Sequence, residues 1–145
     1  MALPPKVFAV RSNLPDVDQA FPRFFEALTL FQEVVARHEE VSEIRNHLQD
    51  VAAQAIAIFR REEEAMEITR DRMILAHRSA HKKFLHSLQK FRGDLDESGP
   101  SIGLAQDVRR DVVDWMSDHH LLMDAALGRR IQTVVEQSLA RMSAA

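Results

Sequence analysis

Apolar residues recur at steps of three and four along almost the whole 145-residue chain, and this spacing is the strongest constraint on its fold. Such steps place side chains on one face of an α-helix, because 3.6 residues complete a turn. Turn formers and strand formers are scarce, with four Gly, five Pro and no Tyr. The sequence therefore predicts an all-α fold, and its length predicts a single domain.

Four segments carry an apolar stripe, and we expect them to form an up-down-up-down four-helix bundle. The inward positions are Val17, Phe21, Phe24, Leu28, Phe31 and Val35 in the first segment; Ile44, Leu48, Val51, Ala55, Ile58, Glu62 and Met66 in the second; His77, His81, Phe84, Leu88 and Phe91 in the third; and Val108, Val112, Trp115, His119, Leu122 and Ala126 in the fourth.

Less regular sequence separates and flanks these segments. Residues 1–13 predict an extended N-terminal arm, and residues 70–73 predict a tight connection. Residues 93–103 predict a loop, in which Ser101 is the expected N-cap of the last helix. Gly128 is expected to interrupt that last helix. Residues 129–145 predict a C-terminal helical extension, which could pack on the bundle or on a second subunit to give a homodimer.

Composition excludes several classes of partner. The net charge is −3, and no basic run exceeds two residues, as in Arg60-Arg61 and Arg109-Arg110, which is too short for the phosphate contacts that nucleic acid requires. Neither an export signal nor a run of 18 apolar residues is visible, so we expect a cytoplasmic protein without a membrane partner. Because there is no Cys, any metal ion must be held by imidazole and carboxylate groups.

Several inward positions are polar, which is costly for a buried carboxylate unless it is paired, protonated or bound to a cation. Glu62 occupies such a position. His77 and His81 lie four residues apart, so they stack on one helix face and can bind one ion together. His119 points inward from the last helix. These four residues predict a metal site in the core of the bundle.

Asp124 is a fifth candidate ligand, five residues after His119. Five residues advance a regular helix by about 500°, which leaves Asp124 about 140° away from His119. It can reach the same ion only from one side or through a local distortion of the helix. Otherwise Asp124 accepts a hydrogen bond from a bound water or from an imidazole N–H group of a ligand.

The remaining histidines and acidic residues are interpreted as surface residues. His38, His47 and His86 fall on polar or boundary positions. His120 is rotated by about 100° from His119 and is expected to be a bystander. Glu63 and Glu64 are expected to form a solvated face.

The spacing of these residues resembles that of the hemerythrin family, in particular the bacteriohemerythrins. The family pattern is His-Phe-x-x-Glu-Glu-x-Leu-Met, then His-x-x-x-His-x-x-Phe, then Trp-x-x-x-His-x-x-x-x-Asp on successive helices. The chain matches it at Phe59, Glu62, Glu63, Met66, His77, His81, Phe84, Trp115, His119 and Asp124. The resemblance covers Val17 to Ala126 and implies a hemerythrin-like bundle that binds nonheme iron.

The chain departs from the family at two positions. Phe21 stands where the family has a histidine on the first helix, and Ile58 stands where it has the histidine before Phe59. In the family these two histidines bind the second of two irons, while three others bind the first. The resemblance therefore implies one iron per chain, with Phe21 and Ile58 at replaced ligand positions; two irons, or zinc or manganese instead, stay open.

Three histidines and two carboxylates leave one position open on a six-coordinate ion such as iron or manganese. The leading hypothesis is a mononuclear iron protein that binds or senses O2, NO or peroxide. The alternatives are a diiron O2-binding bacteriohemerythrin with substitute ligands, an enzyme that acts on superoxide or peroxide, and a bundle stabilised by a structural ion such as Zn²⁺. No residue is assigned a catalytic role.

Overall fold

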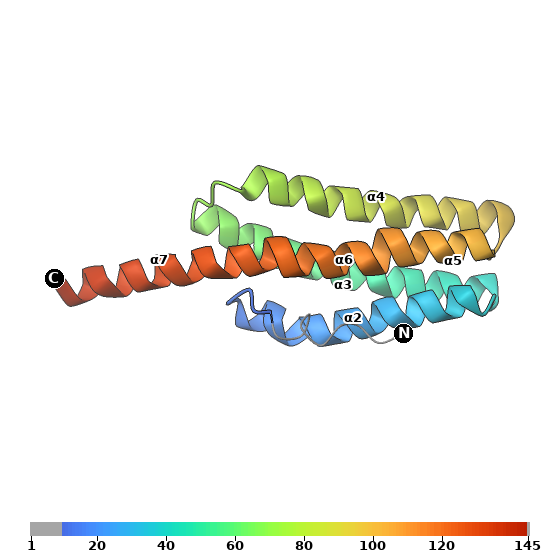
Figure 1. Cartoon of the computed structure of the whole chain (residues 1–145), viewed down its shortest axis with the longest axis horizontal. Helices are drawn as coiled ribbons and strands as arrows, with labels where there is room; N and C mark the ends of the chain where they lie inside the picture. The colour runs from blue at the N-terminus through green and yellow to red at the C-terminus, as the bar shows by residue number, and fades with distance from the viewer. Residues whose placement is uncertain (1–9, 145) are drawn as a thin grey trace.

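The computed structural model describes residues 10–144 and is all-helical over them (Figure 1). The long helices are α2 (Pro15–Ala36), α3 (Val41–Ile68) and α4 (Ile74–Ser98). They are followed by α5 (Ile102–Val108), η1 (Arg109–Asp114), α6 (Trp115–His119), η2 (His120–Asp124) and α7 (Ala125–Ala144), which succeed one another without a gap. The predicted all-α class is confirmed, and residues 10–144 contain no strand.

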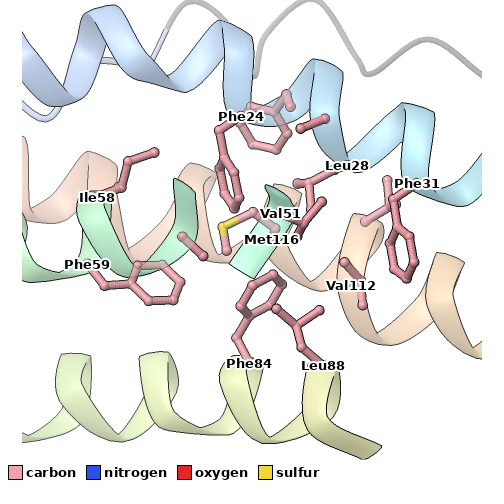
Figure 2. Packing of buried hydrophobic residues seen from close by; sticks show 14 of the residues in the cluster. Phe24, Leu28, Phe31, Val51, Ile58, Phe59, Phe84, Leu88, Val112 and Met116 are labelled. Carbon is pink, nitrogen blue, oxygen red and sulfur yellow. The ribbon is translucent and has the colours of Figure 1, made fainter. Parts of the chain in front are cut away.

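The helices lie lengthwise beside one another (Figure 1), and buried apolar side chains form a core between them. Figure 2 shows side chains from α2, such as Phe24 and Leu28, pointing between α3, α4 and the last helical run toward Phe84 and Met116. Every predicted inward residue of the first three stripes is buried. Removing this apolar surface from water supplies the main stabilisation of such a fold.

The predicted loop at residues 93–103 is wrong over its first half. Helix α4 continues through Gly93 to Ser98, because one glycine in a helix costs only about 1 kcal/mol relative to alanine and Leu95 beyond it is buried in the core. The chain turns at Gly99, whose φ of 71° suits glycine. Ser101 then caps α5 as expected, its Oγ accepting a hydrogen bond from Leu104 N at 3.0 Å.

Gly128 does not interrupt the last helix, contrary to expectation. Instead it lets the chain before α2 cross α7 at close range, since a Cβ at this position would lie 2.2 Å from the Arg11 carbonyl oxygen. Asn13, in the left-handed region at φ 61°, donates from Nδ2 to Gly128 O at 2.8 Å. Of the predicted N-terminal arm, residues 1–9 lie outside the described residues.

The predicted C-terminal extension is part of α7, which runs past the ends of the neighbouring helices in Figure 1. Its last turns expose Val135, Leu139 and Met142. The packing of this segment on a second subunit stays a prediction. Within residues 10–144, no helix has both the length and the apolar character needed to cross a bilayer.

Candidate metal centre

All five residues predicted as ligands lie together in the interior. Glu62 comes from α3, His77 and His81 from α4, His119 from α6 and Asp124 from η2. Each offers one nitrogen or oxygen atom, these atoms lie within 4.8 Å of one another, and all five residues are buried. Such a cluster could hold a metal ion.

The histidine nitrogens converge on two carboxylate oxygens. Nε2 of His77 lies 3.1 Å from Asp124 Oδ1, and Nε2 of His119 lies 3.3 Å from the same oxygen. On the other side of the cluster, His81 Nε2 is 3.2 Å from Glu62 Oε1. The three imidazole rings meet edge to face, with centroids 4.6–5.1 Å apart.

Hydrogen bonds do not satisfy this cluster. Six buried side-chain atoms lack a hydrogen-bond partner within the described residues: Glu62 Oε1 and Oε2, His77 Nδ1, His81 Nε2, and His119 Nδ1 and Nε2. Although His81 Nε2 and Glu62 Oε1 are close, their geometry is not that of a hydrogen bond. Leaving a buried polar atom unpaired costs roughly 1–3 kcal/mol. A cation bound by these atoms would satisfy most of them at once, so the residues fit a metal ion.

Asp124 reaches the cluster because the helix is distorted beside it. Residues His120–Asp124 form a π-helical turn, in which hydrogen bonds join residues five apart and so bring residue 124 back over residue 119. The π-turn is the kind of local distortion through which Asp124, five residues after His119, was expected to reach the same ion. The same turn displaces Leu122, which was predicted to face the core but is 70% exposed. π-Turns of this kind occur frequently at functional sites.

His120 is not a bystander, and this interpretation was wrong. The π-turn rotates its ring into the interior, where it is 1% exposed. Its Nδ1 lies 2.9 Å from Asp124 Oδ2, and its ring lies 3.8 Å from that of Phe21. A signal was present in the sequence, since His120 and Asp124 are four residues apart and residues at this spacing are neighbours on a helix.

Glu63 also contacts the cluster, against the expectation of a solvated face. Its Oε2 lies 2.9 Å from His81 Nδ1, while Oε1 accepts a hydrogen bond from Arg78 Nε at 3.1 Å. A carboxylate on the outer nitrogen of a histidine fixes the ring so that the other nitrogen, Nε2, faces an ion. The stagger of α3 against α4 creates this contact, and no spacing within α3 reveals it.

The other predictions for surface residues hold with one exception. Glu64, His38 and His86 are exposed, whereas His47 is half-buried; none of them belongs to the cluster. A surface groove of about 350 Å³ lies next to the cluster, lined among others by Phe59, Glu63, Arg78 and His81.

Aromatic rings hold two of the imidazoles in place. Phe59 stacks on His81 with centroids 3.8 Å apart and an interplanar angle of 5°. Trp115 stacks on His119 at 4.9 Å and 10°. Because each ring is clamped between a neighbour and the core, its Nε2 keeps one direction. The ligand atoms are thus pre-arranged on rigid helices.

Burial sets the charge state of the cluster. Desolvation raises the pKa of Glu62 well above its ordinary value, and the neighbouring Asp124 carboxylate raises it further. Burial acts on Asp124 in the same direction, but the surrounding imidazoles of His119, His120 and His77 outweigh it and hold the pKa of Asp124 well below its usual range. Burial, His77 and His119 lower the pKa of His81 to about 2. A neutral His81 has a free lone pair, which metal binding requires.

The two positions predicted to be replaced ligands, Phe21 and Ile58, are apolar and buried, each 4% exposed. Neither side chain can bind a metal ion. Phe21 packs against His120 on the Oδ2 side of Asp124.

Comparison of the chain with protein-family models, with curated protein sequences and with solved structures finds no match. The function proposed below therefore rests on the buried cluster and on the spacing of its residues.

Proposed function

We propose that the chain is a hemerythrin-like up-down-up-down four-helix bundle that binds one nonheme iron and, on it, a small ligand such as O2, NO or peroxide. The observation that carries the proposal is the convergence of five buried donor groups, His77, His81, His119, Glu62 and Asp124, on one point. Their spacing in the sequence, which resembles that of the hemerythrins, supports iron as the metal.

The donor set suits a divalent ion of intermediate hardness. Imidazole is typical of iron, zinc and copper sites, whereas carboxylates favour harder ions, so a mixed set of this kind fits iron or manganese. Two carboxylates offset the charge of a divalent cation, which makes its burial tolerable. Five protein ligands leave one position free on a six-coordinate ion, and the bound iron would supply O2, NO or peroxide binding there.

The residues around the cluster would control access to it. Phe59 covers one face of His81, and Phe21 and Ile58 are buried apolar side chains. The groove beside Glu63 and His81 supports an approach for a ligand of a few atoms from the surface between α3 and α4. Arg78, which bonds both Glu63 and Glu67, borders that groove.

A single ion is favoured over a pair. Phe21 and Ile58 offer no donor atom, and no histidine in residues 10–144 other than His77, His81 and His119 belongs to the cluster. O2 carriage in the hemerythrin family draws two electrons from two irons. A mononuclear centre in this chain is therefore better suited to binding or sensing than to carriage by that route.

A purely structural ion is the second candidate, favoured by the unpartnered buried atoms of Glu62, His81 and His119, most of which a bound cation of any kind would satisfy. Binding of NO separates the two functions, because a structural ion has no open position. We expect anaerobic, iron-loaded protein to take up NO in an amount equal to its iron content. His86→Ala, at an exposed position, serves as the control and should do the same.

NO uptake should disappear together with the iron in His81→Ala. Protein that retains its iron but takes up no NO would contradict the ligand-binding function and leave the structural one. Iron-loaded protein that consumes superoxide or peroxide faster than free iron would point instead to the enzymatic alternative.

A further inference from the structure

His120 is a buried, hydrogen-bonding side chain that the ligand set does not use. It is 1% exposed and lies beside the candidate ligand His119 in the chain. A histidine brought into an apolar interior loses its hydration, so its position requires a compensating partner. Its Nδ1 lies 2.9 Å from Oδ2 of the Asp124 carboxylate, which supplies such a partner.

The two oxygens of Asp124 face different neighbours. Oδ1 lies toward the cluster, 3.1 Å from His77 Nε2 and 3.3 Å from His119 Nε2. Oδ2 lies on the other side and meets His120 Nδ1. An oxygen that accepts an N–H hydrogen bond has less electron density to offer a cation, whereas the other oxygen keeps its lone pairs free.

The ring of His120 is held where it is. Phe21 lies 3.8 Å from it, tilted by 35°, and Phe25 meets it edge-on at 5.7 Å. Turning the ring away from Asp124 would displace close-packed aromatic side chains, which costs free energy in a dense interior. The π-turn that carries Asp124 into the cluster also carries His120 to this place.

We propose that His120 is a positioning residue, which holds Asp124 so that it binds the metal ion through Oδ1 alone. The proposal rests on the metal centre proposed above. A carboxylate free to rotate can bind an ion through both oxygens and so fill two coordination positions. Held by His120, Asp124 fills one position, and the position for the small ligand stays open.

The test compares three variants loaded with Co²⁺, whose visible absorption reports coordination number. His120→Leu removes the N–H donor and keeps an apolar side chain of similar size. His120→Asn places an amide N–H near the position of Nδ1, and His86→Leu is the control at an exposed site. We expect His120→Leu to bind Co²⁺ roughly 10–100-fold more weakly, as is typical when such a hydrogen bond is lost.

The spectrum distinguishes positioning from mere stabilisation. The Co²⁺ absorption of His120→Leu should weaken and shift as Asp124 becomes a two-oxygen ligand, while His120→Asn and His86→Leu should keep the native spectrum. If His120→Leu lowers only the melting temperature and leaves the spectrum and the Co²⁺ affinity unchanged, His120 is a structural residue and the proposal is overturned.

Two further outcomes are informative. If His120→Leu does not fold, as judged by circular dichroism, His120→Asn is compared with His120→Gln, whose amide reaches further; equal spectra and affinities for the two would overturn the proposal. Wild-type protein that binds no Co²⁺ would refute the metal centre itself. Failure of the centre is thereby separated from failure of the role assigned to His120.

Discussion

Glu62 is the residue whose position is hardest to explain without a metal ion. It is fully buried, both its oxygens lack a hydrogen-bond partner in the described chain, and burial raises its pKa well above the usual value of 4.5. A carboxyl group in that position destabilises the metal-free fold near neutral pH, either as a buried charge or as a proton held against its natural pKa. Binding a cation would remove that cost.

Glu62→Gln should therefore stabilise the metal-free protein and weaken metal binding. The folded-state pKa of Glu62 is raised, so its contribution to stability is present below pH 4.5 and is lost as the pH rises through the folded value. We expect the variant to gain roughly 1–3 kcal/mol over wild type at pH 8, and no gain below about pH 4.5. Urea unfolding at both pH values measures this, with Glu64→Gln at an exposed position as the control.

His81 gives a pH dependence of the opposite sign. Its pKa falls from 6.5 to about 2 on folding. Between these two pH values, His81 is protonated in the unfolded chain and neutral in the folded chain. The contribution of His81 is present above pH 6.5 and is lost as the pH falls. In metal-free protein, the unfolding free energy of wild type minus that of His81→Gln should decrease by at most about 1.4 kcal/mol per pH unit below 6.5. A flat difference, as expected for the control His86→Gln, would contradict it.

At the scale of elements, the site is shaped by the last helical run and by the segment before α2, which crosses that run. The run continues from Ile102 to Ala144 with two π-helical turns, and the second turn brings Asp124 and His120 inward. Gly128, one turn further on, lies under the Arg11 backbone. The α7 helix is therefore fixed both by the site and by the segment before α2.

Two glycine substitutions test this packing as a matched pair. Alanine favours a helix over glycine by about 1 kcal/mol, so Gly93→Ala, with no atom within 4 Å of the new Cβ, should stabilise the protein by roughly 0.5–1 kcal/mol. Gly128→Ala should destabilise it by about 1–3 kcal/mol, because its Cβ would lie 2.2 Å from Arg11 O. Thermal unfolding measures both changes in stability. Stabilisation by both substitutions would show that the Arg11 backbone can move away from Gly128.

The apolar periodicity predicted the long helices and the inward faces of the first three well, because each stripe follows the regular 3.6-residue period. It failed at Leu122 and His120, where a π-turn changes that period, and at Gly93, where a glycine lies inside a helix. Four of the five candidate ligands come together as the stripes predicted, and Asp124 joins them through the π-turn. Glu63 was missed because its contact with His81 depends on how far α3 is shifted along α4, which no single stripe encodes.

Across the whole molecule, three residues would act together under the proposed function to exclude a second ion. Phe21 and Ile58 remove donors, and His120 occupies the second oxygen of Asp124 beside Phe21. A second ion would need both new donors and that oxygen. Under the proposed function, this whole side of the core, and not one residue alone, excludes a second iron.

A triple variant should recover the second ion. Phe21→His with Ile58→His supplies two imidazoles, and His120→Leu frees Asp124 Oδ2. We expect about two irons per chain in the triple variant and about one in the Phe21→His/Ile58→His double variant, by elemental analysis. Two irons in the double variant would show that His120 does not block the second position.

The most direct test of the central claim is the iron content of wild-type protein purified without chelator, with an optical spectrum before and after exposure to air. We expect close to one iron per chain, no absorption band of an oxo-bridged pair, and loss of the iron in His81→Ala but not in His86→Ala. Two irons per chain with such a band would contradict the mononuclear centre, and iron retained by His81→Ala would contradict the cluster as its site.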